Sequence, residues 1–409
     1  MKILMVSETM PAPQLGGLAK HAITQANTLI EQGHDVTLLG RASVDYESCR
    51  AEMGFKGRFL GALPDDKGWK EQSWGYFNPW RRPRWAYQVA QAILEHAAGH
   101  DVVHYHGNLP LVAAFIPRDI NFVQTRHDQG SECLVHVRYR SSGLCTDVDP
   151  SACAACAGPH PNAVQRWVSS RSVQIYRHLS ARALERHKTI YVSEAIRSNG
   201  RRVLPAAAFE RSWVVHNFVD QQRLSRDTEG VTPPVGPGRP RDVLIASRLD
   251  DAKGVGPFLE HWQRLRPADA RLRIVGDGPL RAAMEARYGG PAVEFLGHQP
   301  YAITLRMTAA SHAAVIPSLC EEACSTTILE ALYLGVPCYA LARGGNPELS
   351  RYERWPGQLQ LFESGEALVQ GLVRYLETPP PNNERNHPEA RVSSDVRAAL
   401  PMVLEIYGR

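Results

Sequence analysis

Short apolar runs alternate along most of the chain with longer stretches in which apolar residues recur at helical spacing. The first run, Lys2–Ser7, is followed by a helical-period segment that ends at Gly33. Further runs of the same kind stand at 35–40, 101–106, 122–125, 189–193, 213–217, 242–247, 272–275, 293–296, 313–316 and 337–341. This alternation is typical of α/β folds, and it predicts doubly wound, parallel sheets.

A segment rich in proline and glycine divides this pattern into two. Residues 230–240 hold four prolines and three glycines, a composition that continues neither a helix nor a central strand. We therefore expect two Rossmann-like domains facing each other across a cleft, over 1–220 and 241–385, joined by a linker over 221–240. An amphipathic tail over 386–409 is predicted to form a helix that crosses back to the first domain.

Composition excludes several classes of protein. The chain has 46 Lys and Arg against 42 Asp and Glu, with 44% hydrophobic and 22% charged residues, which is ordinary for a globular protein and excludes wholesale disorder. A net charge of +4 does not indicate a nucleic-acid partner, which needs clustered basic residues. The longest apolar stretch, 328–342, is interrupted and too short to span a bilayer. A cytoplasmic enzyme is expected.

The stretch from Pro317 to Pro337 is predicted to run from the end of a buried strand through a loop into a helix that begins near Ser325. Such a turn directs free backbone N–H groups, here of Thr326 and Thr327, towards the edge of the sheet, where they suit a diphosphate. Glu322 lies on the loop and Glu330 in the helix. One carboxylate can face a sugar while the other accepts hydrogen bonds from a ribose. The alternative is that both are solvated surface groups.

These residues resemble the E-x7-E signature of the retaining, GT-B-fold glycosyltransferases, in particular family 4, with Glu322 and Glu330 at that spacing. The stretch 247–254 is similar to the arginine–lysine pair of the family, through Arg248 and Lys253. Gly276 stands in a stretch that resembles its strand-end glycine turn. A departure from the family pattern follows Glu322, where small glycine-rich residues are usual.

The resemblance implies a retaining glycosyltransferase that moves a sugar from a UDP or GDP donor to a hydroxyl of a carbohydrate or lipid-linked acceptor. It implies a place in the biosynthesis of cell-surface polysaccharide, glycolipid or glycosylated metabolites. Arg248 and Lys253 would neutralise the leaving diphosphate without a catalytic metal. Glu322 would orient the sugar and Glu330 would hold the ribose, while Ser325 would begin the donor-binding helix.

In the first domain, the resemblance implies a donor-binding role for the loop with Gly16 and Gly17, whose backbone could approach an oxyanion closely. The alternative is a tight turn without a ligand. His127 follows a buried strand, and in related enzymes a histidine at this strand end lines the donor-sugar pocket. We therefore expect His127, with Arg248, Lys253 and Glu322, in the catalytic centre.

Three other functions compete with this one. An NAD(P) oxidoreductase is disfavoured because Arg281 replaces the third glycine of the dinucleotide fingerprint and Pro279 removes a backbone donor. A non-catalytic GT-B subunit that binds a glycan or a partner stays open because of the altered loop after Glu322. A sugar-nucleotide epimerase shares the fold and would interconvert donors without an acceptor.

Aromatic and arginine residues are interleaved between Trp69 and Tyr87. Such a surface suits a sugar acceptor, a membrane interface or a pyrophosphate-linked lipid. The alternative is that the rings cover a loop and fill the edge of the core. The acceptor is expected to contact Trp80, Arg81, Arg82 and Trp85, with peripheral association at the inner face of the membrane.

Four of the eight cysteines fall within a predicted insertion at about 130–160. Two of them have the C-x-x-C spacing of a metal knuckle, and thiolates in a cytosolic protein often bind zinc. Free thiols or disulfides, and an iron–sulfur cluster, are the alternatives. The residues of this structural zinc hypothesis are Cys133, Cys145, Cys153 and Cys156.

Overall fold

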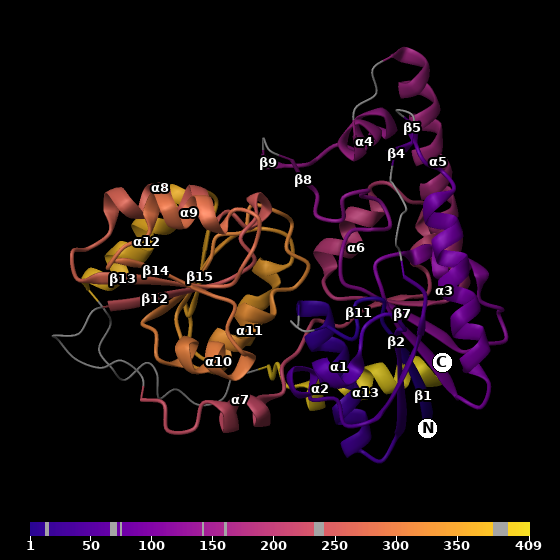
Figure 1. Ribbon diagram of the computed structural model, residues 1–409, viewed down its shortest axis with the longest axis horizontal. Helices are drawn as coiled ribbons and strands as arrows, with labels where there is room; N and C mark the ends of the chain where they lie inside the picture. Colours follow the sequence, from indigo (N-terminus) through magenta and orange to yellow (C-terminus); the bar gives the residue numbers. More distant parts are fainter. Residues whose placement is uncertain are drawn as a thin grey trace. The chain divides into compact units, whose positions relative to one another are not determined.

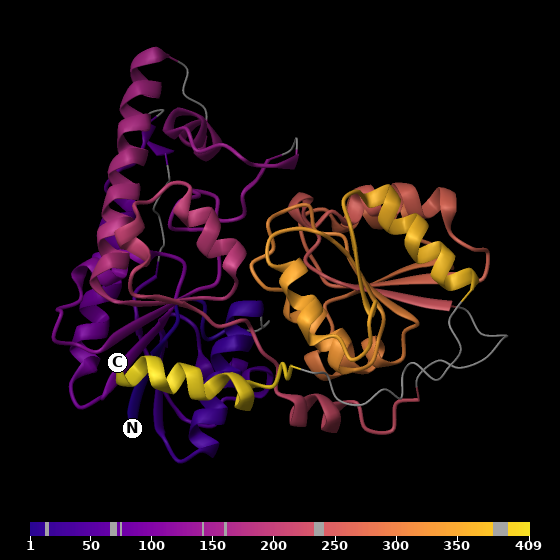
Figure 2. The ribbon, with the colours of Figure 1, turned by 180° about the vertical axis from the view of Figure 1, so that it is seen from behind.

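The computed structural model describes residues 1–12, 16–65, 72–73, 76–140, 143–158, 162–232, 241–378 and 392–409. The chain divides into two compact units, each built on one parallel sheet (Figures 1 and 2). The first consists of Met1–Arg140, Cys145–Asn217 and Ala399–Arg409, and the second mainly of Phe218–Ala398. The predicted α/β class with two Rossmann-like sheets is therefore confirmed.

The first sheet has seven parallel strands. Strand β1 (Lys2–Val6), an interior strand of this sheet, is buried on both faces. Successive side chains of a strand point to opposite sides of the sheet, and both sides are covered here. The strand order reverses between β1 and β6. In spatial order the strands are β11 (Ser212–Val214), β10 (Lys188–Tyr191), β7 (Phe122–Arg126), β6 (Val102–His106), β1 (Lys2–Val6), β2 (Asp35–Arg41) and β3 (Arg58–Leu63).

Helices cover both faces of this sheet. On one face Leu4 and Val6 pack with α3 (Arg81–Ala97) and α5 (Ala163–Arg186). On the other, Ile3 packs among residues of three further helices. These are α1 (Gly17–Glu31), α2 (Tyr46–Met53) and the C-terminal α13 (Val396–Gly408).

The predicted C-terminal helix is α13, which lies against the first sheet (Figure 2). Its Tyr407 hydroxyl is 2.9 Å from Gln25 Nε2 and 2.7 Å from His104 Nδ1. Leu400 and Val403 are buried in the same core. Residues 386–391 of the predicted tail lie outside the described part of the chain, as do 233–240 of the predicted linker.

The second sheet has six parallel strands, and the chain passes through them in the same spatial order as in the first sheet. Its two central strands are β12 (Arg241–Ala246) and β15 (Ala313–Ile316). On one side follow β13 (Ala270–Val275) and β14 (Val293–Gly297), and on the other β16 (Cys338–Leu341) and β17 (Leu359–Phe362).

In one core of this unit, α8 (Val255–Leu265) and α12 (Gly365–Glu377) pack their apolar sides against the sheet. Trp262 is fully buried in this core. The segment 221–227, part of the predicted linker, is a helix of this unit rather than an extended connection. The helices are α7 (Gln221–Asp227), α8 (Val255–Leu265), α9 (Arg281–Tyr288), α10 (Tyr301–Ala309), α11 (Thr326–Tyr333) and α12 (Gly365–Glu377).

The predicted insertion forms small local elements between β7 and α5. Two-residue strands β8 (Tyr139–Arg140) and β9 (Gly143–Leu144) precede α4 (Pro150–Ala157). Asp149 caps α4, accepting a hydrogen bond from a backbone N–H of its first turn. A second small pair, β4 (Gln72–Ser73) and β5 (Tyr76–Phe77), lies before α3.

Candidate active site

In the second sheet, the strand order reverses between β12 and β15. Open α/β sheets bind ligands in the crevice outside the carboxyl ends of the strands at such a point. The loop after β12 carries Arg248 and Lys253, and the loop after β15 carries Glu322. The fold therefore brings three predicted site residues, far apart in sequence, to one edge of the sheet.

Lys253 and Glu322 form an ion pair in which Nζ lies 2.6 Å from Oε1. Burial raises the pKa of Glu322, but the charge and hydrogen bond of Lys253, with smaller contributions from Ser318 and Arg248, together hold that pKa below its usual value. Burial likewise lowers the pKa of Lys253, and Glu322 reverses the shift, so the pKa of this ammonium is raised. Both groups are consequently ionised at neutral pH.

Asp250 organises the loop that holds the two cations. Its carboxylate pairs with the Arg248 guanidinium and accepts a hydrogen bond from the Lys253 backbone N–H at 3.1 Å. The Arg248 side chain is 66% exposed, so it can reach an incoming anion. Nothing in the sequence pattern alone assigned this positioning role to Asp250.

Gly276 allows β13 to end close against the same loop. Its φ of +134° is rare for residues with a side chain, and a Cβ there would lie 1.9 Å from the carbonyl oxygen of Ser247. Its N–H donates to the Gly297 carbonyl oxygen at 2.8 Å. The glycine turn thus sets the position of the backbone directly before Arg248.

The start of α11 lies at the end of the loop with Glu322. Ser325 is the N-cap, and its side chain accepts a hydrogen bond from a backbone N–H of the first turn. Thr326 and Thr327 are the first residues of the helix, where N–H groups have no partner within the helix. The positive end of the helix dipole adds to their attraction for an anion.

Glu330 lies one turn further along α11 and is only 4% exposed. It accepts a hydrogen bond from the Tyr301 hydroxyl at 2.8 Å. Burial and the neighbouring Glu330 carboxylate raise the pKa of Tyr301, so this hydroxyl stays a donor. Glu330 is therefore an oriented, buried carboxylate rather than a solvated surface group.

Three histidines meet at the carboxyl edge of the first sheet. Within the described ranges, His21, His106 and His127 form the one group of three or more metal-ligating side chains whose ligand atoms all lie within 4.8 Å of one another. Nδ1 of His106 is 3.1 Å from Nε2 of His127. Burial lowers the pKa of His21 to about 4 and that of the other two well below the usual value. All three imidazoles are therefore neutral at pH 7.

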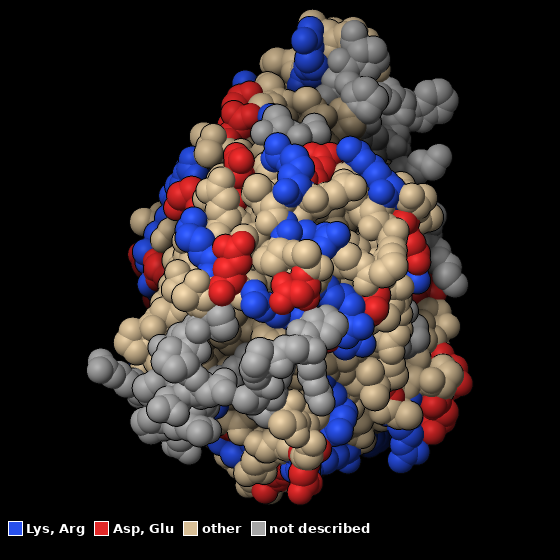
Figure 3. Space-filling model, turned by 90° about the vertical axis from the view of Figure 1, so that its left-hand side faces the viewer, with Lys and Arg blue, Asp and Glu red and all other residues tan. Residues whose placement is uncertain are grey.

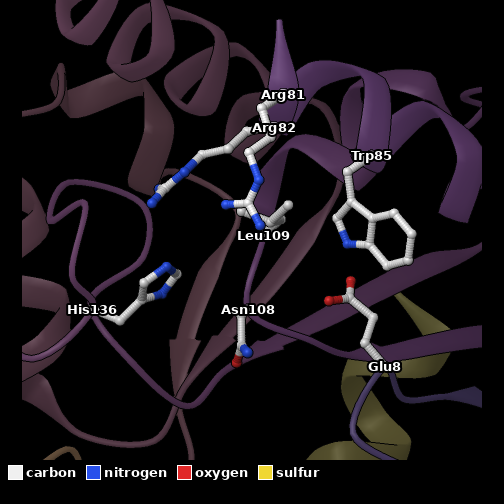
Figure 4. A pocket seen from close by; sticks show the side chains of 7 residues that line it. All are labelled: Glu8, Arg81, Arg82, Trp85, Asn108, Leu109 and His136. Carbon is white, nitrogen blue, oxygen red and sulfur yellow. The ribbon is translucent and has the colours of Figure 1, made fainter. Parts of the chain in front are cut away.

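A pocket of about 140 Å³ lies at the switch point of the first sheet, between β1 and β6 (Figure 4). Three of the four residues predicted to contact an acceptor line it, while Trp80 is 75% exposed and is not among the lining residues. The pocket is lined by Glu8, Arg81, Arg82, Trp85, Asn108, Leu109 and His136.

The glycine pair of the first unit stands at the start of α1. Gly16 is its N-cap and has no side-chain cap hydrogen bond, and Gly17 is the first helical residue. A Cβ on Gly16 would meet nothing within 4 Å, so packing does not require glycine there. Residues 13–15 of this loop lie outside the described part.

The four cysteines of the insertion line one small cavity of about 20 Å³. Two arginines contact their sulfurs: Arg140 Nε is 2.9 Å from Sγ of Cys156, and Arg177 Nη2 is 3.0 Å from Sγ of Cys153. Burial raises the pKa of Cys133 and Cys153. The four thiols line the same cavity, but no three of them bring their sulfurs within 4.8 Å of one another among the described residues, so the structure does not draw them together as tightly as a tetrahedral zinc would.

Acidic and basic side chains are interspersed on the described part of the face drawn in Figure 3. In the second unit, Arg271 contacts Asp242 at 2.7 Å and Glu294 at 3.3 Å. Among the residues described, no helix has the length and apolar character needed to cross a membrane.

Each of the two units matches a known protein family. The family description "Glycosyltransferase Family 4" matches residues 15–223, which is more than half of the 409 residues. The chain belongs to glycosyltransferase family 4. The description "Glycosyl transferases group 1" matches residues 240–378, the unit that contains Arg248, Lys253 and Glu322.

Two curated relatives match this chain at low sequence identity. A glycogen synthase of Mycobacterium tuberculosis is 25% identical over 364 residues, 84% of this chain and 79% of that protein. WcaL of Escherichia coli K12, named as a colanic acid biosynthesis glycosyltransferase, is 26% identical over 154 residues, 35% of this chain. The match spans only 38% of the length of WcaL.

Solved structures confirm the GT-B fold. Anabaena HepE in complex with UDP aligns over 100% of both chains, with a TM-score of 0.63 and 17% identity. Sucrose-phosphate synthase of Thermosynechococcus elongatus aligns over 100% of this chain and 98% of its own, with a TM-score of 0.65 and 15% identity.

The sequence did not predict several residues that contact the candidate site of the second unit or line the pocket of the first. Tyr301 and His136 carry no signal that would have singled them out. Glu8 and Asn108 follow the apolar runs of β1 and β6, and their place after two central strands could have pointed to the switch point.

Binding of a structural zinc by the four cysteines of the insertion stays a prediction. We expect near-stoichiometric zinc by elemental analysis of the purified protein, lost in a Cys153→Ser, Cys156→Ser double variant because tetrahedral zinc needs its thiolate ligands. Cys49→Ser, which changes a buried cysteine elsewhere in the same unit, should keep the metal. Absence of both zinc and iron from the wild-type protein would contradict the hypothesis, and iron in place of zinc would favour a cluster.

Proposed function

We propose that this chain is a retaining glycosyltransferase that moves a sugar from a nucleotide-diphosphate donor to a hydroxyl of a carbohydrate or glycolipid acceptor, giving an α-linkage. The observation that carries the proposal is the partly buried Lys253–Glu322 ion pair at the switch point of the second sheet. A fixed ammonium of this kind is suited to the negative charge that a departing diphosphate develops.

Each neighbouring group takes a role in donor binding. Arg248 provides the second cation, and its planar guanidinium can contact two phosphate oxygens at once. The backbone N–H groups of Thr326 and Thr327 donate hydrogen bonds to the diphosphate at the start of α11. Glu330 accepts hydrogen bonds from the ribose, and its contact with the Tyr301 hydroxyl orients the carboxylate.

The ion pair also explains why Glu322 is suited to orient the sugar. Lys253 occupies one of its carboxylate oxygens, and the other can accept hydrogen bonds from sugar hydroxyls. A covalent carboxylate nucleophile is not required if the acceptor attacks on the face from which the diphosphate departs. His127, as a neutral imidazole, is suited to exchange a hydrogen bond with an uncharged sugar hydroxyl without adding charge.

UDP or GDP is the proposed leaving nucleotide. Structures of the neighbour HepE contain UDP, UDP with glucose, and UDP-glucose, which supports UDP as the first candidate. The names of the curated relatives support a role in polysaccharide, glycolipid or glycosylated-metabolite synthesis. Peripheral association with the inner face of an anionic membrane stays a prediction of the arginine- and tryptophan-containing segment.

The test is a thermal-shift panel of UDP, GDP, ADP and their sugars, followed by transfer assays with the nucleotide that stabilises the protein. We expect one nucleotide to raise the melting temperature, and turnover to persist in EDTA because Arg248 and Lys253 replace a metal. Loss of turnover that only Mn²⁺, Mg²⁺ or Zn²⁺ restores would contradict the metal-free assignment, including at the three histidines, which are suitable zinc ligands.

The same assays separate the other candidates. Nucleotide-sugar binding without hydrolysis or transfer, across a panel of acceptors, would indicate a non-catalytic binding subunit. Interconversion of donor sugars in the absence of an acceptor would indicate an epimerase. Full absence of nucleotide binding by the wild-type protein would remove the proposed function itself.

A further inference from the structure

The pocket of the first unit has the position of a ligand site. It lies where the order of the first sheet reverses, with Glu8 shortly after β1 and Asn108 shortly after β6. Ligands of open α/β sheets bind outside the carboxyl ends of strands at that point. Its volume of about 140 Å³ is below the roughly 300 Å³ at which pockets for drug-sized ligands begin. The space therefore suits a single sugar ring rather than an oligosaccharide.

Glu8 supplies a hydrogen-bond acceptor in this pocket. Its carboxylate points towards the indole of Trp85 (Figure 4) and accepts hydrogen bonds from Trp85 and from the Tyr105 hydroxyl. Burial raises the pKa of Glu8, so the carboxylate is poorly solvated. Two donors use about half of the roughly four lone-pair sites of a carboxylate. The remaining sites suit the hydroxyl donors of a sugar.

Trp85 and His136 form two further walls. Trp85 is 7% exposed, and its flat ring offers an apolar surface to the C–H face of a pyranose. His136 is held in place by Asp128, whose Oδ2 lies 3.1 Å from Nδ1 of His136. Asp128 is in turn paired with Arg126, with 2.9 Å between Oδ1 and Nη2. These contacts fix the shape of the pocket before a ligand binds.

The two arginines play different parts. Arg82 donates from Nη2 to the Leu134 carbonyl oxygen at 2.5 Å and stacks 4.9 Å from the centre of the Tyr176 ring, so it supports the fold. Arg81 is the first residue of the 17-residue helix α3, where the helix dipole adds to its positive charge. An anionic group on a ligand would be stabilised beside Arg81, opposite the carboxylate of Glu8.

We propose that this pocket binds one residue of the acceptor, a monosaccharide unit that carries an oxyanion, either a carboxylate or a phosphate. Glu8 accepts hydrogen bonds from its hydroxyls, Trp85 packs against its ring, and Arg81 pairs with its charge. The inference rests on the proposed glycosyltransferase function, because it names the acceptor class of that reaction. It makes Arg81 the residue that selects a charged acceptor over a neutral one.

The test measures binding by calorimetry or saturation-transfer NMR, with glucuronate, galacturonate, glucose 1-phosphate and glucose 6-phosphate against glucose and galactose. We expect at least one anionic sugar to bind about tenfold more tightly than its neutral counterpart. Arg81→Gln should remove that preference, because it loses the charge and retains much of the side-chain length. Arg84→Gln, three residues along the same helix and exposed, is the matched control and should keep it.

The uronates and the sugar phosphates distinguish the two sources of charge. Equal affinity of anionic and neutral sugars, or an equal loss in the Arg81→Gln and Arg84→Gln variants, would overturn the inference. Failure of all four anionic sugars to bind would overturn it as well. Nucleotide binding measured on the same samples keeps the two proposals apart, since it should be unchanged by Arg81→Gln and would be missing from the wild-type protein only if the proposed function fails.

Discussion

Lys253→Ala is expected to lower kcat for sugar transfer by about 10²–10³, the usual cost of removing one preorganised group that stabilises transition-state charge. The substitution removes the ammonium that lies 2.6 Å from Glu322. It also leaves the partly buried Glu322 carboxylate without its main counter-charge, so burial raises its pKa unopposed by Lys253. We expect a loss of unfolding free energy of about 1–2 kcal/mol in addition to the catalytic loss.

Steady-state kinetics with the nucleotide sugar identified by thermal shift measure the first effect, and thermal unfolding measures the second. Lys56→Ala is the matched control, because Lys56 forms a more exposed ion pair with Glu31 at 2.8 Å and exposed pairs contribute about 0–1 kcal/mol. It should leave kcat within about twofold. A Lys253→Ala enzyme that is folded and turns over at the wild-type rate would exclude Lys253 from leaving-group stabilisation.

Gly276→Ala is expected to lower the stability of the second unit by at least about 2 kcal/mol. Its backbone has a φ of +134°, and the new Cβ would lie 1.9 Å from the Ser247 carbonyl oxygen. Relief of this clash requires backbone movement in the loop that carries Arg248 and Lys253. For a unit of this size the loss corresponds to a fall in melting temperature of roughly 4–8 °C, with weaker nucleotide binding.

Gly290→Ala provides the comparison within the same unit. A Cβ at Gly290 would meet nothing within 4 Å, so its melting temperature should stay within about 1 °C of the wild type. Calorimetry can follow both variants and resolve the transitions of the two units. Equal melting temperatures for Gly276→Ala and the wild type would show that the loop relaxes without cost and that Gly276 is not needed for its geometry.

Most central strands were predictable because parallel strands covered on both faces are short, nearly continuous apolar runs. The run at 313–316 is β15, and that at 122–125 is β7 with one residue more. The strands β3 and β17 were missed. Both lie at an edge of their sheet and are only partly buried, so their sequences lack the continuous apolar pattern.

The residues of the candidate site likewise include some that the sequence predicted and some that it did not. Arg248, Lys253 and Glu322 were predictable because they stand in short motifs directly after strands, where a parallel sheet places its functional loops. Tyr301 and Asp250 were not, because their roles are contacts with other loops and helices. For the proposed acceptor pocket, the sequence pointed to the arginines of α3 but not to Glu8, whose carboxylate is held there by contacts with Trp85 and Tyr105.

The sequence alone determined the two parallel sheets, the division between them and the residues at the ends of their strands, because these are local properties of apolar period, glycine and proline. Only the tertiary structure decided which side chains meet. It paired Lys253 with Glu322 across 69 residues of sequence and placed Glu8 beside Trp85. Such contacts depend on strand order and helix packing, and no local pattern encodes the distance between two loops that the fold brings together.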